Sequence, residues 1–198
     1  SSGSASGADT SKYTVLYSSQ PATLNYLTTA TDLEMVVGAN CVDTLVEYDN
    51  KGVMREGLAT KWEWDADTLT WTFTLREENW VDNNGEVVAP VTAQDFVDAL
   101  QYVLTPDYAS SNAGLVTAYI AGANDYYNYH VYLTNAENGT VDDDGTTYVT
   151  DGSGNVTVTA ADGTASTYAP VDFDSVGVTA VDDHTLAYTL TYDFPGFL

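Results

Sequence analysis

The stretch from Leu58 to Arg76 constrains the fold of this chain more than any other. Its second half alternates between two faces, one with Leu69, Trp71, Phe73 and Leu75 and the other with Thr70, Thr72, Thr74 and Arg76. Its first half alternates in the same way, with Leu58, Thr60, Trp62 and Trp64 opposite Lys61, Glu63 and Asp65. Side chains along a strand point alternately to the two faces of a sheet. The pattern therefore predicts an antiparallel hairpin that turns at Asp65–Asp67 and has one covered and one solvated face.

An amphipathic helix with a capping signal is predicted between Val91 and Pro106. Thr92 precedes an apolar run and Asp95 lies three residues later, which is the spacing of a capping box. The run places four apolar residues on one helical face, namely Phe96, Ala99, Leu100 and Val103. Pro106 ends the helix because a proline ring clashes with the preceding turn. We expect this helix to cover a sheet.

Other elements are predicted on both sides of this unit. A stripe with a spacing of four residues predicts a helix from Asp32 to Leu45, with Cys41 as a buried, inert thiol on the stripe Leu33, Val37, Cys41 and Leu45. Alternation predicts a strand over 12–18 and a strand pair over 175–181 and 184–191. Two more helices are predicted over 110–119 and 121–128.

The composition changes between Tyr129 and Pro170, where Gly, Asp, Thr and Asn dominate. Short β-prone runs occur at Thr147–Thr150 and Asn155–Thr159, and Asp-Gly pairs begin at Asp144, Asp151 and Asp162. Such pairs are typical of tight hairpin turns. This segment is predicted to be a small β-meander inserted into the domain.

The charge balance excludes several classes of function. There are 5 Lys and Arg against 29 Asp and Glu, so the formal net charge is −24. This charge repels phosphate backbones and anionic membrane surfaces, which argues against nucleic-acid binding. A content of 44% hydrophobic and 12% aromatic residues indicates a folded chain. The single cysteine allows no intramolecular disulfide.

Three segments in a fixed order carry a resemblance to a known family. They are GLATKWEWDADTLTWTFTLREENWVDNNGEVV (57–88), VTAQDFVDALQYVLTPDYAS (91–110) and VGVTAVDDHTLAYTL (176–190). They resemble the oligopeptide-binding family of extracytoplasmic solute-binding proteins, which feed ABC importers. The resemblance implies an α+β fold, with a mainly antiparallel sheet and a few covering helices. It also implies the architecture of a type II periplasmic-binding-protein-like receptor, represented here by an N-terminal fragment.

The resemblance further implies a division of the chain and a set of partners. Residues 1–11 are expected to be a flexible tether and residues 12–44 the N-terminal part of the ligand-binding lobe. Residues 45–190 are expected to be an accessory α+β domain with the insertion at about 129–170, and residues 191–198 return to the lobe. The partners would be an oligopeptide and an ABC permease in the membrane. We expect a monomeric, cofactor-free binding protein outside the cell, anchored through a lipid-modified cysteine that precedes the tether.

Candidate ligand-binding residues follow from the same resemblance. In the family, an extended segment after an L-D-P-like motif contacts the peptide backbone, and Leu24-Asn25-Tyr26 takes the place of that motif here. The implied ligand-binding residues are Thr29, Ala30, Thr31, Asp32 and, after the P-x-x-A-S run, Asn112. The family's acidic group that holds the peptide ammonium would lie beyond Leu198. We therefore expect that this chain alone does not bind peptide measurably.

Other interpretations of the sequence have less support. Asp142–Gly145 resembles part of a Ca²⁺ loop, but the full pattern fails at Thr140 and tight turns favour aspartate in any case. Neither His130 nor His184 lies in a nucleophile motif, so no catalytic residue is predicted, and a hydrolase with a carboxylate pair stays a low alternative. The tryptophans Trp62, Trp64 and Trp71 could stack on sugar, which leaves a surface adhesion or carbohydrate-binding module as the alternative function. Their positions on the inward face favour core packing.

Overall fold

The computed structural model describes residues 16–17 and 19–198. Its helices are α1 (Asp32–Gly38), α2 (Ala93–Val103), α3 (Ala113–Tyr119) and α4 (Ala123–Asn138), with 3₁₀ turns at Pro106–Tyr108 and Phe173–Ser175. Its strands are β1 (Val46–Tyr48), β2 (Met54–Glu56), β3 (Ala59–Asp65), β4 (Thr70–Leu75), β5 (Asn79–Val81), β6 (Val87–Pro90), β7 (Thr147–Thr150), β8 (Val156–Thr159), β9 (Ala165–Tyr168), β10 (Val178–Asp182) and β11 (Thr185–Thr189). The tether and most of the strand predicted at 12–18 lie outside the described residues.

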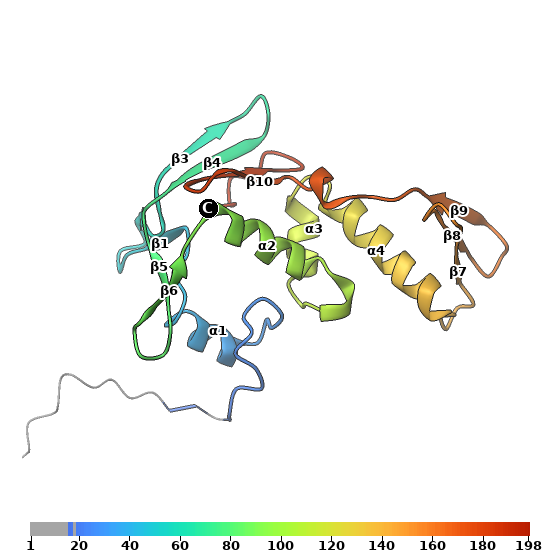
Figure 1. Cartoon of the computed structure of the whole chain (residues 1–198), viewed down its shortest axis with the longest axis horizontal. Coiled ribbons are helices and arrows are strands. Elements are labelled where there is room, and N and C mark those ends of the chain that lie inside the picture. Colours follow the sequence, from blue (N-terminus) through green and yellow to red (C-terminus); the bar gives the residue numbers. More distant parts are fainter. Residues whose placement is uncertain (1–15, 18) are drawn as a thin grey trace, which may run out of the picture.

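A four-stranded antiparallel sheet in the order β10-β11-β4-β3 is the largest sheet of the described residues and lies above α2 in Figure 1. The predicted hairpin is its β3–β4 pair, in which Trp62 lies opposite Phe73 and Trp64 opposite Trp71. The strand pair predicted near the C-terminus is β10–β11, and β11 joins β4 with Leu186 opposite Phe73. Helix α2 packs along β10 and β11. The predicted α+β fold with an antiparallel sheet and covering helices is therefore confirmed.

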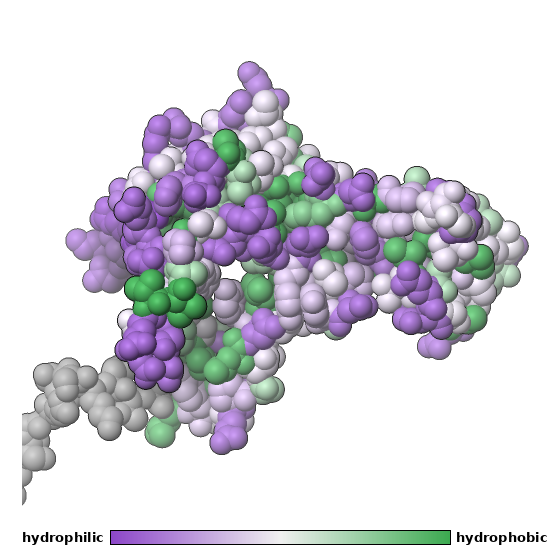
Figure 2. Space-filling view, viewed as in Figure 1, coloured by the Kyte–Doolittle hydropathy of each residue, from purple (hydrophilic) through white to green (hydrophobic). Residues whose placement is uncertain are grey.

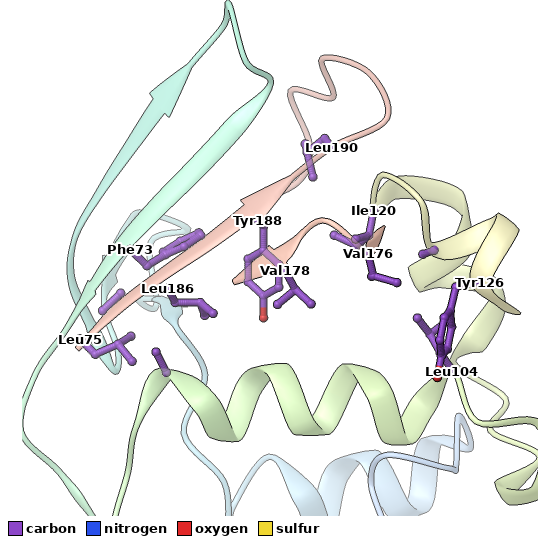
Figure 3. Close-up of a cluster of buried hydrophobic side chains, with 13 residues drawn as sticks. Phe73, Leu75, Leu104, Ile120, Tyr126, Val176, Val178, Leu186, Tyr188 and Leu190 are labelled. Atoms are coloured by element: carbon purple, nitrogen blue, oxygen red, sulfur yellow. The ribbon is translucent and has the colours of Figure 1, made fainter. Parts of the chain in front are cut away.

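The core lies between the sheet and α2 and continues under α3 and α4 (Figure 3). Phe73 and Leu186 are completely buried on the sheet face that meets α2, and Leu104 is completely buried at the other end of α2. Tyr126 extends this core into α4, where its ring contacts that of Phe173 edge to face. Burial also raises the pKa of Tyr188 far above its ordinary value, because the phenolate would lose its hydration.

Two details of the β3–β4 hairpin differ from the alternation in the sequence. A bulge between Ala59 and Lys61 shifts the register, so Ala59 is buried and Thr60 is exposed. The prediction that Thr60 points inward was therefore wrong. The turn covers 66–69 rather than 65–67, and Leu69 belongs to it, with a left-handed φ of 54°. The backbone N–H of Leu190 donates to the Leu69 carbonyl, which fastens this turn to the end of β11.

Helix α1 is shorter than predicted, and this corrects the assignment of Cys41. The helix ends at Gly38, and the backbone N–H of Cys41 closes a tight turn on the Gly38 carbonyl. Cys41 is exposed, so the prediction of a buried thiol was wrong. Gly38 and Asn40 both have low helix propensity, and together they end the helix before the four-residue stripe does. Cys41 and Leu45 continue the apolar spacing in sequence, but both lie beyond the end of the helix.

Helix α4 is longer than predicted and carries the meander at its far end (Figure 1). Residues 129–138, assigned by composition to the β-rich segment, are helical. The meander proper is the three-stranded sheet β7-β8-β9, and its first two strands agree with the predicted runs. Aromatic side chains of α4 hold it, because Tyr132 packs against Tyr148 and Tyr168 while the Tyr129 hydroxyl donates to the Gly154 carbonyl at 2.8 Å.

One turn geometry occurs five times within residues 19–198. In each turn the N–H of the first residue donates to the carbonyl of the fifth, and the fourth residue is a glycine with φ between 73° and 87°. The five turns begin at Asp49, Asp82, Asp142, Asp151 and Ala160. Only glycine adopts this φ at low cost, so the glycine at the fourth position specifies the turn. The aspartates that suggested a Ca²⁺ loop are thus used as turn residues.

The carboxylate of Asp151 accepts the backbone N–H groups of Ser153 and Asn155, at 2.8 and 3.0 Å. The Asn155 side-chain amide and these N–H groups lower the pKa of Asp151, since they stabilise the ionised form. A group whose pKa falls on folding stabilises the fold above its unfolded pKa, about 3.9, and loses this effect as the pH falls through the folded value.

We therefore expect Asp151→Asn to lower the Tm by a few degrees at pH 7. The difference in Tm from the wild type should shrink between about pH 5 and pH 3, where the wild-type carboxylate becomes protonated and therefore uncharged, like the asparagine. Thermal unfolding followed by circular dichroism across this range measures the difference. Asp143→Asn, which removes the same charge in the neighbouring turn, is the matched control. A difference that stays constant down to pH 3 would contradict the role given to the carboxylate.

Candidate functional site

The segment from Asn25 to Thr29, which forms a turn before α1, is held against the connection between α2 and α3. The side-chain amide of Asn112 donates to the carbonyls of Tyr26 and Leu27, both at 3.3 Å, and to that of Thr29 at 3.1 Å. One amide group thus holds the backbone of a segment more than eighty residues away in sequence. We call the contacts between residues 25–29 and 102–112 the clamp.

Three further hydrogen bonds complete the clamp. The Ser110 hydroxyl donates to the Leu27 carbonyl at 2.6 Å, and the Ser111 N–H donates to the Thr28 carbonyl at 3.0 Å. On the other side, the Asn25 amide donates to the Tyr102 hydroxyl at 3.0 Å. These bonds fix the path of the segment without burying a large apolar surface.

The local sequence explains why residues 110–112 are available for the clamp. Thr105 and Pro106 end the α2 region in a short 3₁₀ turn, and Ala109 leaves it in a left-handed conformation with φ 46°. The polar run Ser110-Ser111-Asn112 then connects to α3, for which Asn112 is the N-cap residue. The Asn112 side chain makes no capping bond and is directed at residues 26–29. A short polar link between two helices can be recognised in the sequence. The segment that it contacts, residues 25–29, cannot.

Four of the five predicted ligand residues are consecutive in sequence, from Thr29 to Asp32. The structure places the fifth, Asn112, in hydrogen-bond contact with the Thr29 carbonyl. Thr29 is nearly buried, and its hydroxyl lies 3.2 Å from that of Thr31. Ala30, Thr31 and Asp32 are exposed at the start of α1. Asn112 contacts Thr29 from below through the clamp. The exposed stretch Ala30–Asp32 is therefore presented to solvent from a fixed base.

Glu34 is a buried carboxylate that the sequence analysis did not single out. It lies in α1, and its Oε1 accepts the Ala22 N–H at 2.7 Å, so it ties the preceding loop to the helix. Helix α1 is thus fixed from two sides, by the clamp and by Glu34. This role could not be predicted from the sequence, because it depends on a contact between Ala22 and Glu34, which lie twelve residues apart.

A mainly apolar, open cavity of about 1050 Å³ lies beside the clamp. Its wall includes Tyr26 and Leu27 from the segment, Leu100 from α2, Trp80 from β5 and Phe197 from the C-terminal residues. Figure 2 shows apolar side chains around an opening in the middle of the molecule. None of the five predicted ligand residues belongs to the described lining. The cavity and the stretch Ala30–Asp32 are therefore neighbouring but separate features.

Groups for metal binding do not converge in the described part of the chain. No three His, Cys, Asp or Glu side chains are placed there to hold a metal ion. The ring of His130 packs on Tyr126, and its Nε2 lies 3.2 Å from the Val171 carbonyl. The rings of Trp64 and Trp71 pack 5.2 Å apart and against the core. None of the helices in the described ranges has the length and apolarity to cross a membrane.

Comparison with known proteins assigns a family to this arrangement. Residues 53–198 match the family model described as bacterial extracellular solute-binding proteins, family 5, middle region. The chain belongs to this family of extracellular solute-binding proteins.

The curated relatives agree with this assignment. The oligopeptide-binding protein AliB of Streptococcus pneumoniae is 35% identical over 179 residues, which are 90% of this chain and 21% of the relative. The oligopeptide-binding protein SarA of Streptococcus gordonii is 35% identical over 186 residues, which are 93% of this chain and 22% of the relative. This chain thus spans about a fifth of the curated relatives it matches.

Solved structures show the same fold. The murein tripeptide binding protein MppA of Escherichia coli superimposes with a TM-score of 0.59 and 26% identity, over 88% of this chain and 26% of that one. A periplasmic oligopeptide-binding protein of Borrelia burgdorferi gives a TM-score of 0.60 over 89% of this chain and 27% of that one. Because identity to the latter is 20%, that likeness concerns the fold alone.

Proposed function

We propose that this chain is part of the substrate-binding component of an ABC transporter, which captures oligopeptides outside the cell for import. The observation that carries the proposal is the match of nine tenths of the chain to proteins named for oligopeptide binding. The role is binding rather than catalysis, and the captured peptide passes to a permease in the membrane. The receptor acts as a monomer, anchored by a lipid-modified cysteine that precedes the tether.

The geometry suggests how the chain takes part. Residues 12–44 contribute to the ligand-binding lobe, and the exposed stretch Ala30–Asp32 contacts the peptide there. Residues 45–190 form an accessory domain, with its insertion at about 129–170, and support that stretch through Ser110 and Asn112. Residues 191–198 return to the lobe. The groups that close over the peptide belong to the part of the relatives that this chain does not span.

The test is calorimetric titration with tripeptides to pentapeptides that contain no Lys or Arg. The same peptides are added to the 198-residue chain and to the full-length gene product. We expect heat of binding with the full-length protein and none with the chain alone. Binding by neither would contradict the proposal that the receptor captures short peptides of this composition. Equal binding by both would place the complete site within this chain and overturn the division between domain and lobe.

A further inference from the structure

Strand β9 is an open edge of the meander. It is the last strand in the order β7-β8-β9, and it pairs with β8 alone. All four residues of β9, from Ala165 to Tyr168, are exposed. The meander lies at the end of α4 that points away from the four-stranded sheet, so the chain's main sheet does not cover this edge (Figure 1). The feature is therefore separate from the clamp and the cavity.

The alternation of hydrogen-bonded and non-bonded pairs between β8 and β9 shows which backbone groups of β9 face outward. The Ala160 N–H donates to the Thr164 carbonyl at the turn that joins β8 and β9. Bonded and non-bonded pairs alternate along an antiparallel ladder. The pairs Val158–Ser166 and Val156–Tyr168 are thus the bonded ones, in the register that the structure has. Ala165 and Thr167 direct their N–H and C=O groups away from β8, toward an added strand.

This edge lacks the protection that the main sheet has. The edge strand β3 carries Lys61, Glu63 and Asp65 and a bulge, and the opposite edge strand β10 has a bulge before Asp182. Charges and bulges on edge strands prevent further pairing. The sequence of β9 is Ala-Ser-Thr-Tyr, without charge or proline, and its pairing with β8 is regular throughout. Of these edges, β9 alone is left ready for pairing.

The surrounding charge indicates what kind of strand can add. No Lys or Arg occurs from Glu77 to Leu198. Asp162 lies in the turn before β9, and the turn that contains Asp151 and Gly154 packs against Pro170, just after β9. A second copy of this acidic unit would be repelled, whereas a cationic chain is attracted at both ends of the edge. The ring of Tyr168, 40% exposed, also offers a face to a Lys or Arg side chain.

We propose that β9 is a docking edge for an extended cationic peptide segment, which adds as a fourth strand through the outward groups of Ala165 and Thr167. Alternate side chains of the added strand lie beside Tyr168, and the others lie beside Thr167. The edge acts independently of the site proposed for short imported peptides, because it lies on the meander, away from the clamp and from the stretch Ala30–Asp32.

Binding to the 198-residue chain is tested with an end-blocked octapeptide that alternates Lys and Thr. We expect a perturbation of the amide NMR signals of Ala165 and Thr167, and no binding of the matching Glu/Thr peptide. Thr167→Pro removes the outward N–H and is tolerated because that N–H makes no bond within the sheet. This variant is expected to weaken binding about tenfold, the loss expected from one backbone hydrogen bond.

Two controls separate strand addition from attraction by charge alone. The Lys/Thr peptide that is N-methylated at every residue has the same charge but no backbone N–H donors on either edge, so it should not bind. Thr167→Lys keeps the backbone donor and repels the cationic peptide, while Thr179→Lys places the same charge on the exposed side of distant β10 and should weaken binding far less. If the methylated peptide binds as well as its parent, or if Thr167→Pro binds as well as the wild type, the proposal is wrong. Sedimentation without peptide tests whether β9 instead pairs with a second copy of this chain. A dimer that Thr167→Pro abolishes would assign the edge to that second copy and would also overturn the proposal.

Discussion

Phe73→Ala is expected to lower the free energy of unfolding by about 3–5 kcal/mol, the range for removing a buried phenylalanine ring. Phe73 is completely buried and lies between Trp62 and Leu186 on the neighbouring strands. Its ring meets that of Tyr188 edge to face, with centroids 6.0 Å apart. Because these neighbours come from β3 and β11, the cavity left by alanine cannot close without moving two strands. The Tm should fall by roughly 6–20 °C in a chain of this size.

Urea unfolding followed by tryptophan fluorescence measures this change, because Trp62 and Trp71 flank the site. Thr72→Ala is the matched control on the opposite face of the same strand. Thr72 lies opposite Glu63 and Ala187 on the solvated side, so its replacement should change stability by less than about 0.5 kcal/mol. Equal effects at the two positions would mean that the sheet has no preferred inner face.

The elements with strong local signals were predictable from the sequence. Alternation gave the β3–β4 pair, and the Thr92–Asp95 spacing gave the start of α2, where the structure has a capping box. The Asp-Gly pairs gave the turns of the meander, although in the turn at Asp151 the glycine with positive φ is Gly154 rather than Gly152. In each case the decisive interactions join residues close in sequence, so the pattern alone contains the information.

The elements that depend on distant contacts were not predictable. Cys41 continued an apolar stripe, but the helix ended at Gly38, where Tyr26 packs close to the glycine. Helix α4 is long although its apolar and polar residues are mixed, because its tyrosines pack on the core at one end and on the meander at the other. The resemblance placed Asn112 near a ligand, yet its bonds to residues 26–29 follow only from the folded chain. Tertiary contacts determine the structure at α4 and at Asn112, whereas the low helix propensity of Gly38 and Asn40 ends α1.

Asn112→Ala is expected to release the segment that supports the proposed peptide site. The change leaves the carbonyls of Tyr26, Leu27 and Thr29 without their shared donor, which costs about 1–3 kcal/mol of local stability. Amide hydrogen exchange at residues 27–31 should therefore become about tenfold to a hundredfold faster in the 198-residue chain. In the full-length protein, peptide affinity should fall about tenfold, because the peptide must then order the segment on binding.

Exchange and affinity together distinguish a clamp from a direct ligand contact. If Asn112 acts through the segment, exchange at residues 27–31 accelerates, while exchange in β4 stays unchanged. If Asn112 instead touches the peptide, affinity falls without any change in exchange. Asn112→Asp keeps the shape but removes both N–H donors, so a clamp predicts a loss at least as large as with alanine. Asn124→Ala, an exposed asparagine on α4, controls for the loss of an amide elsewhere. Unchanged hydrogen exchange and unchanged peptide affinity in Asn112→Ala would show that the clamp does not support the proposed peptide site.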